Sequence, residues 1–118
     1  MPKPSSTPVR IHWLDSEWMV EKLRIGAQQM KARDSEIERV LLFGSLARGD
    51  GVPGSDADLL VILSSCDVAF MERIPRYLPT GLPAGVDVFP YTEDEVDRML
   101  ADGNQLVRQA LKEGVTLT

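Results

Sequence analysis

The sequence contains only one cysteine, Cys66, in 118 residues. A single thiol can form neither an internal disulfide nor a zinc cluster, so both of these stabilising devices are excluded. The chain also lacks an apolar run of the roughly 20 residues that cross a bilayer, and its N-terminus lacks the apolar core of a signal peptide. These absences predict a cytoplasmic protein that does not contact a membrane.

Basic charge is scarce as well. The chain has 13 Lys and Arg residues against 18 Asp and Glu residues, which gives a net charge of −5. Binding of nucleic acid through its phosphates depends on clustered Lys and Arg, so direct nucleic-acid binding is not expected. A metal-bound nucleotide or a basic protein partner suits this acidic chain better.

The remaining composition is that of one globular domain. A hydrophobic content of 43% and a charged content of 26% exclude wholesale disorder. The length leaves no room for a second domain. Residues 1–10 hold three prolines and the run Ser5-Ser6-Thr7, which predicts a flexible N-terminal arm. Residues 11–118 are expected to form the single domain.

Apolar runs bounded by turn residues predict the strands. They are expected at residues 37–43, 59–63 and 86–89, with a short edge strand at 115–118. The strands alternate with helical segments, so the fold class is α/β (α+β), with the helices packed mainly on one side of one small sheet.

Helical spacing predicts the other elements. An apolar stripe predicts a helix from a cap at Asp15 or Ser16 to about residue 33: Met19, Leu23, Ala27 and Met30. Shorter helices are expected at 67–74, limited by Pro75, at 93–101 and at 105–113. Thr92 and Glu95 form a capping box for the second of these, and the run Asp102-Gly103-Asn104 stops it and caps the third. The acids around it are interpreted as a solvated helix face: Glu93, Asp94, Glu95 and Asp97.

Residues 43–59 form a loop of mostly small residues between two predicted strands. Gly44 and Ser45 follow the first strand, and Gly49 lies four residues after Ser45. Glycine lacks the Cβ that would keep an anion away from the backbone N–H groups. If Ser45 opens a helical turn, the positive end of that turn adds to the attraction. The loop therefore has the features of a phosphate-binding loop.

Asp56 and Asp58 lie one residue apart on an extended segment, so both side chains point to the same face of the sheet. Two carboxylates this close repel each other unless a cation lies between them. Mg²⁺ takes oxygen ligands and is usually held by one or two carboxylates together with substrate phosphates. This segment predicts a magnesium site beside the phosphate-binding loop.

Asp87 is an acid within the apolar run Val86-Asp87-Val88-Phe89. An aspartate among apolar residues is costly unless it is paired or bound to a metal. From the residues alone, two interpretations stay open: a metal ligand, or an exposed residue at a strand end.

Three segments together resemble the signature of the DNA polymerase beta-like nucleotidyltransferase superfamily: Gly44-Ser45, Ala47-Arg48-Gly49 and Ser55-Asp56-Ala57-Asp58-Leu59. The chain looks most similar to the minimal nucleotidyltransferases (MNT) of prokaryotic toxin–antitoxin pairs. This resemblance implies the nucleotidyltransferase fold with a small mixed sheet. It also implies three catalytic, metal-binding carboxylates: Asp56, Asp58 and Asp87. Leu46 and Ala57 depart from the family pattern without removing a ligand.

The resemblance further implies the chemistry. Two Mg²⁺ ions would be held by the three carboxylates, with ATP as the substrate. An acceptor hydroxyl would attack the α-phosphorus while pyrophosphate leaves. Gly44, Ser45 and Ser55 would bind the nucleotide phosphates. Arg48 would either contact those phosphates or pair with Asp50 on the surface.

The acceptor has to come from another molecule, because relatives with their own acceptor site usually carry an additional domain. By resemblance, the acceptor is a tyrosine of a partner HEPN-family ribonuclease toxin, which addition of AMP would silence. Two alternatives stay open. One is a non-catalytic antitoxin that neutralises its partner by complex formation, and the other is nucleotidyl transfer to a small molecule.

Two other interpretations fail on the residues. An EF-hand calcium loop starting at Asp56 needs Gly at its sixth position and Glu at its twelfth, where Val61 and Asp67 stand. Ser45 is not an acyl-transfer nucleophile, because Gly44-Ser45-Leu46-Ala47 lacks the second glycine of a nucleophile elbow.

Overall fold

The computed structural model describes residues 7–48, 57–79 and 85–118, with side chains from residue 17 onward except that of Ser45. The described elements follow one another in this order: α1 (Thr7–Arg33), β1 (Ile37–Phe43), α2 (Ser45–Arg48), β2 (Ala57–Leu63), α3 (Phe70–Arg76), β3 (Val86–Thr92), α4 (Glu93–Ala101), α5 (Gln105–Glu113) and β4 (Val115–Thr116).

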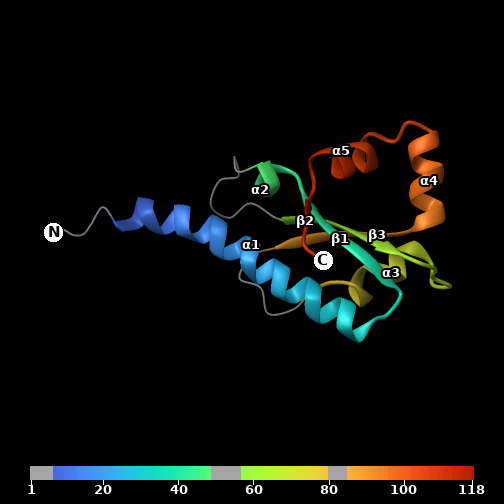
Figure 1. Cartoon of the computed structure of the whole chain (residues 1–118), viewed down its shortest axis with the longest axis horizontal. Helices are drawn as coiled ribbons and strands as arrows, with labels where there is room; N and C mark the ends of the chain where they lie inside the picture. The colour runs from blue at the N-terminus through green and yellow to red at the C-terminus, as the bar shows by residue number, and fades with distance from the viewer. Residues whose placement is uncertain (1–6, 49–56, 80–84) are drawn as a thin grey trace.

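The four strands form one mixed sheet in the order β3-β2-β1-β4 (Figure 1). β1 is antiparallel to both of its neighbours, β2 and β4. β2 and β3 are parallel, and the connection between them contains α3, because parallel neighbours need a crossover. This mixed sheet with its helices confirms the predicted fold class.

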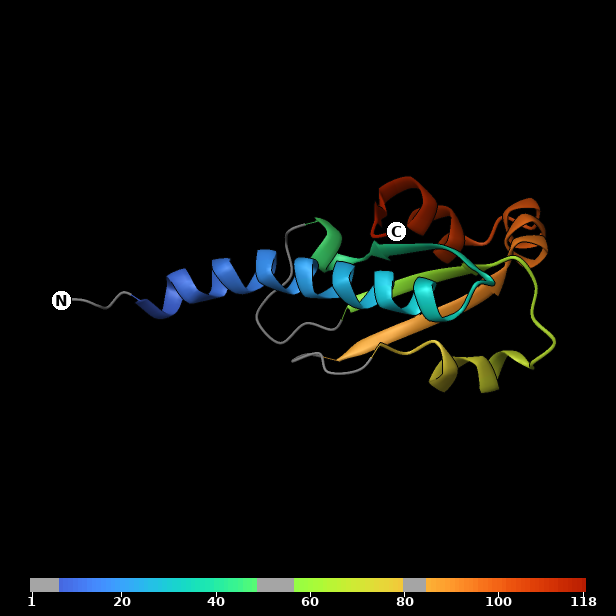
Figure 2. The same cartoon turned by 60° about the horizontal axis from the view of Figure 1, so that its bottom comes forward.

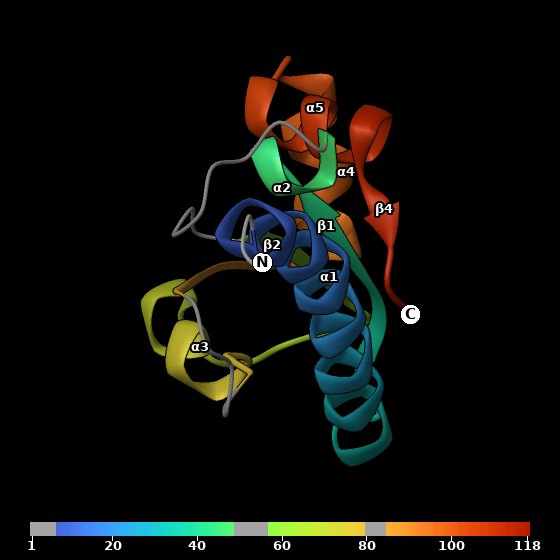
Figure 3. The same cartoon turned by 90° about the vertical axis from the view of Figure 1, so that its left-hand side faces the viewer.

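Helices cover both faces of the sheet, so the expectation that they lie mainly on one side is wrong. Leu23 and Ala27 of α1 belong to one hydrophobic cluster, together with Tyr77 just after α3. Val96 of α4 and Val107 of α5 belong to a second cluster. In Figure 3, which looks towards the start of α1, α4 and α5 lie on one side of the strands and α1 and α3 on the other. Both faces need cover because β2 is apolar on both.

Helix α1 is longer than the sequence predicts. It begins at Thr7, eight residues before Asp15, so residues 7–10 are helical rather than part of an arm. Pro8 is compatible with this start, because the first turn of a helix does not need the N–H that proline lacks. Residues 1–6 lie outside the described residues, so an arm there stays a prediction. Figure 2 shows the first half of α1 extending past the end of the sheet.

The apolar stripe predicted for α1 is confirmed. Leu23, Ala27 and Met30 are buried, and Met19 packs against them from a partly buried position. Their contact with the sheet fixes which side of α1 faces outward. That outward side becomes important below.

The strands differ from the predictions mainly in length. β1 has the predicted bounds, whereas β3 continues past Phe89 to Thr92. Pro90 is tolerated within β3 because this strand is at the edge of the sheet. The short edge strand near the C-terminus is confirmed as β4, which pairs with β1.

The helices α4 and α5 begin at their predicted caps. Both hydrogen bonds of the capping box between Thr92 and Glu95 are present, and Asn104 accepts a hydrogen bond from the N–H of Val107 at 2.9 Å. The helix expected at 67–74 is α3, which begins three residues later, at Phe70, and ends two residues later, at Arg76, so the prediction that Pro75 limits it is wrong. None of the helices in the described part of the chain is both long and apolar enough to cross a membrane.

Candidate functional site

Two of the three predicted carboxylates lie side by side in the sheet. Asp58 near the start of β2 is the register partner of Asp87 near the start of β3. Neighbouring strands are about 4.8 Å apart, and register partners in a parallel pair project to the same face. Asp58 is half-buried and Asp87 is exposed. The two carboxylates therefore share one edge of one face, where solvent can reach them.

The period of two along each strand identifies that face. Asp58 alternates with Leu60 and Ile62, and Asp87 alternates with Phe89 and Tyr91. These four apolar residues all belong to the cluster under α4 and α5 or pack against it. The carboxylate pair thus lies on the face covered by α4 and α5, at the N-terminal ends of β2 and β3.

Gly44 sits directly against Asp58. It follows β1 with a φ of +85°, a backbone conformation that L side chains rarely adopt. A Cβ added at Gly44 would lie 2.5 Å from Oδ2 of Asp58. Sequence reasoning assigned this glycine to a phosphate. The structure shows a second reason for glycine at this position: only a residue without a side chain leaves room for the Asp58 carboxylate.

The helical turn expected at Ser45 is present as α2. The N–H of Arg48 closes this turn by donating a hydrogen bond to the carbonyl oxygen of Gly44 at 3.1 Å. The side chain of Arg48 reaches α5, where Nη1 lies 3.4 Å from Oε1 of Glu113. Both side chains are about one third to two fifths exposed. Sequence reasoning offered phosphate contact or pairing with Asp50, and it missed Glu113, which lies 65 residues away.

Several predicted site residues lie outside the described residues. These are Ser55 and Asp56, together with Asp50 as the alternative partner of Arg48 and the side chain of Ser45. Within the described ranges, no group of three or more His, Cys, Asp or Glu side chains is placed to hold a metal ion. The third carboxylate of the predicted set is Asp56, so its role stays a prediction.

Residues 23–115 match the nucleotidyltransferase domain family. This match spans most of the chain. The chain belongs to the nucleotidyltransferase domain family. None of the curated proteins compared with it is a significant match.

Solved structures share the fold of this nucleotidyltransferase domain. A protein from Sulfolobus solfataricus, provisionally assigned as a nucleotidyltransferase, is 23% identical with a TM-score of 0.61, covering 98% of this chain and 89% of its own. A toxin–antitoxin structure with AMP-PNP is 19% identical with a TM-score of 0.54, covering 80% of this chain and 72% of its own. At these identities the similarity shows the fold alone.

A nucleotidyltransferase acts on a nucleotide, usually with a divalent metal. The described donor set fits such an ion, since Asp58 and Asp87 present carboxylate oxygens from adjacent positions. The side chain of Asp87 is exposed, so a metal ion can reach it from solvent. A divalent cation would remove the repulsion that two neighbouring carboxylates otherwise cost.

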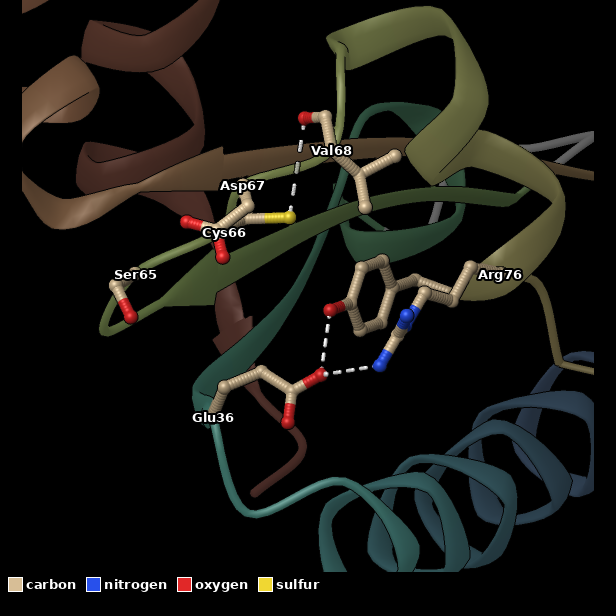
Figure 4. Close-up of a pocket in the computed structure, with 7 residues that line it drawn as sticks. Glu36, Ser65, Cys66, Asp67, Val68 and Arg76 are labelled. Carbon is tan, nitrogen blue, oxygen red and sulfur yellow. Dashed lines mark hydrogen bonds and ion pairs between the residues drawn. The ribbon is translucent and has the colours of Figure 1, made fainter.

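The opposite end of the sheet contains a cavity of about 210 Å³ in this nucleotidyltransferase domain (Figure 4). At its base the hydroxyl of Tyr77 donates a hydrogen bond to Glu36 at 2.6 Å. Nη2 of Arg76 lies 3.4 Å from the same Glu36 oxygen. The Tyr77 bond is the main reason why the pKa of Glu36 is lowered, and burial is the main reason why the pKa of Tyr77 is raised. These groups satisfy one another, so we assign them to the fold.

A buried ion pair lies at the same end, and sequence reasoning missed it. Arg73 is 5% exposed and donates to both carboxylate oxygens of Glu95, at 2.7 and 3.1 Å. It also donates to the carbonyl oxygens of Val68 at 2.7 Å and Pro90 at 3.1 Å. The bond from Arg73 is the largest cause of the lowered pKa of Glu95. The interpretation of Glu95 as a solvated acid is therefore wrong.

Proposed function

We propose that this chain is a magnesium-dependent nucleotidyltransferase that moves AMP from ATP to a hydroxyl on a tyrosine of a partner HEPN-family toxin. One observation carries the proposal: Asp58 and Asp87 are register partners on adjacent strands. The family supports nucleotidyl transfer in general. The finer parts, which are the metal, the nucleotide, the acceptor and the partner, are tested below.

The proposed roles of the residues follow from their positions. Asp56, Asp58 and Asp87 would hold two Mg²⁺ ions. When bound, these ions would neutralise the triphosphate oxygens and lower the cost of deprotonating the acceptor hydroxyl. Asp87 is exposed, so an acceptor from another molecule can approach it. The acceptor oxygen would bond to the α-phosphorus as the bond from that phosphorus to pyrophosphate breaks.

The loop after β1 would bind the phosphates. Gly44 brings backbone close to Asp58, and the first N–H groups of α2 have no partner within a helix. Ser45 and Ser55 would add hydroxyl donors. Arg48 would exchange the Glu113 carboxylate for a phosphate oxygen, since their contact at 3.4 Å is half-exposed and therefore weak.

The choice of partner rests on two supports. Residues 43–59 resemble minimal nucleotidyltransferases, whose partners are HEPN toxins. A structural neighbour is a toxin–antitoxin structure with AMP-PNP, an adenine nucleotide analogue, which favours both a toxin partner and ATP. The same neighbour favours a second candidate function, an antitoxin that neutralises its toxin by binding alone.

The test follows radiolabel from α-labelled ATP to a co-purified helical ribonuclease partner. The native chain should transfer label only with Mg²⁺. Asp58→Asn and Asp87→Asn should each lower the rate by about 10²- to 10³-fold, the usual loss when charge stabilisation of a transition state is removed. Asp94→Asn, at an exposed acid on α4, is the matched control and should keep the native rate.

Partner neutralisation separates the two candidate functions. If transfer is the mechanism, Asp87→Asn should still bind the partner but should no longer block its ribonuclease activity. If Asp87→Asn blocks the ribonuclease as well as the native chain does, the non-catalytic antitoxin is the correct function. If the label moves to a small molecule instead, the acceptor is that molecule and not a protein.

A further inference from the structure

Large exposed hydrophobic side chains gather on one layer of the molecule. Among the described residues they are Trp18, Ile25, Met71 and Leu78, from α1, from α3 and from the segment just after α3. Trp18 and Ile25 are 47% and 42% exposed and lie seven residues apart on α1. Seven residues make about two turns, so these two side chains lie on one side of the helix.

That side faces away from the sheet. The residues at helical spacing around Ile25 are all exposed, and we name them the α1 stripe: Trp18, Glu21, Lys22, Ile25, Gln28, Gln29 and Ala32. The opposite side of α1 holds Leu23, Ala27 and Met30, which pack on the sheet. Figure 1 shows α1 along the outside of the molecule.

We propose that the α1 stripe is a docking surface for a second copy of this chain, with the two α1 helices antiparallel about a two-fold axis at Ile25. A two-fold interface uses the same surface on both subunits, so that surface has to be complementary to itself when reversed. The sequence of the stripe allows this requirement to be checked residue by residue.

Reversal about Ile25 places large residues against small ones and charges against amides. Trp18 falls opposite Ala32 of the second copy, and Ile25 meets Ile25 at the axis. Glu21 and Lys22 face the Gln28-Gln29 pair, whose amides can both donate and accept hydrogen bonds. Lys22 already lies over the Trp18 ring within one copy, 5.4 Å from its centroid.

The order of charges along one flank of the α1 stripe also favours the antiparallel arrangement. Acids come first along α1, at Glu17 and Glu21, and bases follow on the same flank, at Arg24 and Lys31. Antiparallel pairing brings Glu17 next to Lys31 of the second copy, twice by symmetry. Parallel pairing would instead bring Trp18 against Trp18 and would place this flank against the opposite flank of the second copy, away from Lys31. The charge order therefore favours the antiparallel arrangement.

The α1 stripe and the carboxylate pair lie on different faces. Asp58 and Asp87 share the face of α4 and α5, whereas α1 covers the other. Pairing through α1 would leave both carboxylate pairs accessible. The inference stands whether or not the chain transfers AMP.

Sedimentation velocity of the purified full chain, over a concentration series up to near-millimolar, tests the proposal. The native chain should shift from monomer to dimer. Ile25→Glu places two carboxylates at the axis and should weaken association by more than about tenfold. Met71→Glu, at a 73% exposed residue of α3, is the matched control and should associate like the native chain. Circular dichroism confirms that each variant is folded.

Charge reversal tests the antiparallel order. Glu17→Lys and Lys31→Glu should each weaken the dimer, and the double variant should restore it. Oxidation of Ile25→Cys in a Cys66→Ser chain should form a disulfide between two copies, while Met71→Cys in the same background should not. The proposal is overturned if the native chain stays monomeric throughout, if Ile25→Glu dimerises normally, or if the two cysteine variants cross-link equally.

Discussion

Acidic side chains at the two ends of the central sheet have different neighbours. At one end Glu36 and Glu95 each accept a short hydrogen bond, from Tyr77 and from Arg73. At the other end Asp58 and Asp87 stand next to each other on parallel strands. Acids that accept hydrogen bonds from matched donors stabilise a fold, whereas two neighbouring carboxylates repel each other unless a cation lies between them. The first end holds the domain together, and the second is where we place its chemistry.

The Arg73–Glu95 pair is expected to have the largest effect on stability. Arg73→Met should lower the free energy of unfolding by about 2–3 kcal/mol, at or just below the lower limit for breaking a fully buried pair, because the Glu95 side chain is 33% exposed. Urea unfolding measures this loss. Arg76→Met, three residues along on α3, breaks only a half-exposed contact and should cost clearly less stability than Arg73→Met. Equal losses of stability in the two variants would contradict the claim that the Arg73–Glu95 pair stabilises the domain more than the Arg76–Glu36 contact does.

Gly44→Ala tests the end of the sheet where Asp58 and Asp87 lie. The new Cβ would lie 2.5 Å from Oδ2 of Asp58, so that carboxylate has to move. We expect transfer activity to fall by about ten- to a hundredfold, because a shift of about 1 Å at a catalytic group has effects of this size.

Gly103→Ala is the matched control for Gly44→Ala. Gly103 also has a positive φ, of +77°, but the nearest atom to an added Cβ is Arg108 Nη2 at 3.9 Å. Both variants should lose about 1–2 kcal/mol of stability from backbone strain. Only Gly44→Ala should lose activity. If Gly103→Ala loses as much activity, strain rather than displacement of Asp58 is the cause.

Tyr77→Phe should cost about 1.5 kcal/mol, since it removes a hydrogen bond to a carboxylate. The loss should depend on pH. The pKa of Glu36 is lowered from 4.5, so its contribution is complete above that value and disappears as the pH falls through the lower folded pKa. Native and variant unfolding curves should therefore converge in acid. A difference that is unchanged well below pH 4.5 would contradict this account.

Glu113→Gln should have the smallest effect. The Arg48–Glu113 contact is half-exposed, so its loss should cost less than about 1 kcal/mol. If Arg48 binds phosphate, removing the competing carboxylate should tighten ATP binding by about two- to threefold, measured by calorimetry. Weaker ATP binding by Glu113→Gln would show that Glu113 holds Arg48 in its useful position.

Local patterns predicted much of this fold. The apolar run of β1 and the caps at Thr92 and Asn104 act over a few residues, so their positions could be read directly. Contacts between distant segments could not. Arg73 meets Glu95 from 22 residues away and Arg48 meets Glu113 from 65, and no local pattern indicates either pair.

The candidate site divides in the same way. The period of two predicted which residues share a face within one strand. It could not predict that Asp58 and Asp87 are register partners, because register depends on how β2 and β3 pack together. Nor could the sequence show that Gly44 lies against Asp58, which requires the bend after β1.

Binding of Mn²⁺, a spectroscopic substitute for Mg²⁺, tests the central claim most directly. Electron paramagnetic resonance of the chain with AMP-PNP reports the bound ion without any partner or turnover. Native chain and Asp94→Asn should bind Mn²⁺ equally, whereas Asp58→Asn and Asp87→Asn should each weaken binding by at least about tenfold. Undiminished Mn²⁺ binding by Asp87→Asn would contradict a metal site shared between β2 and β3.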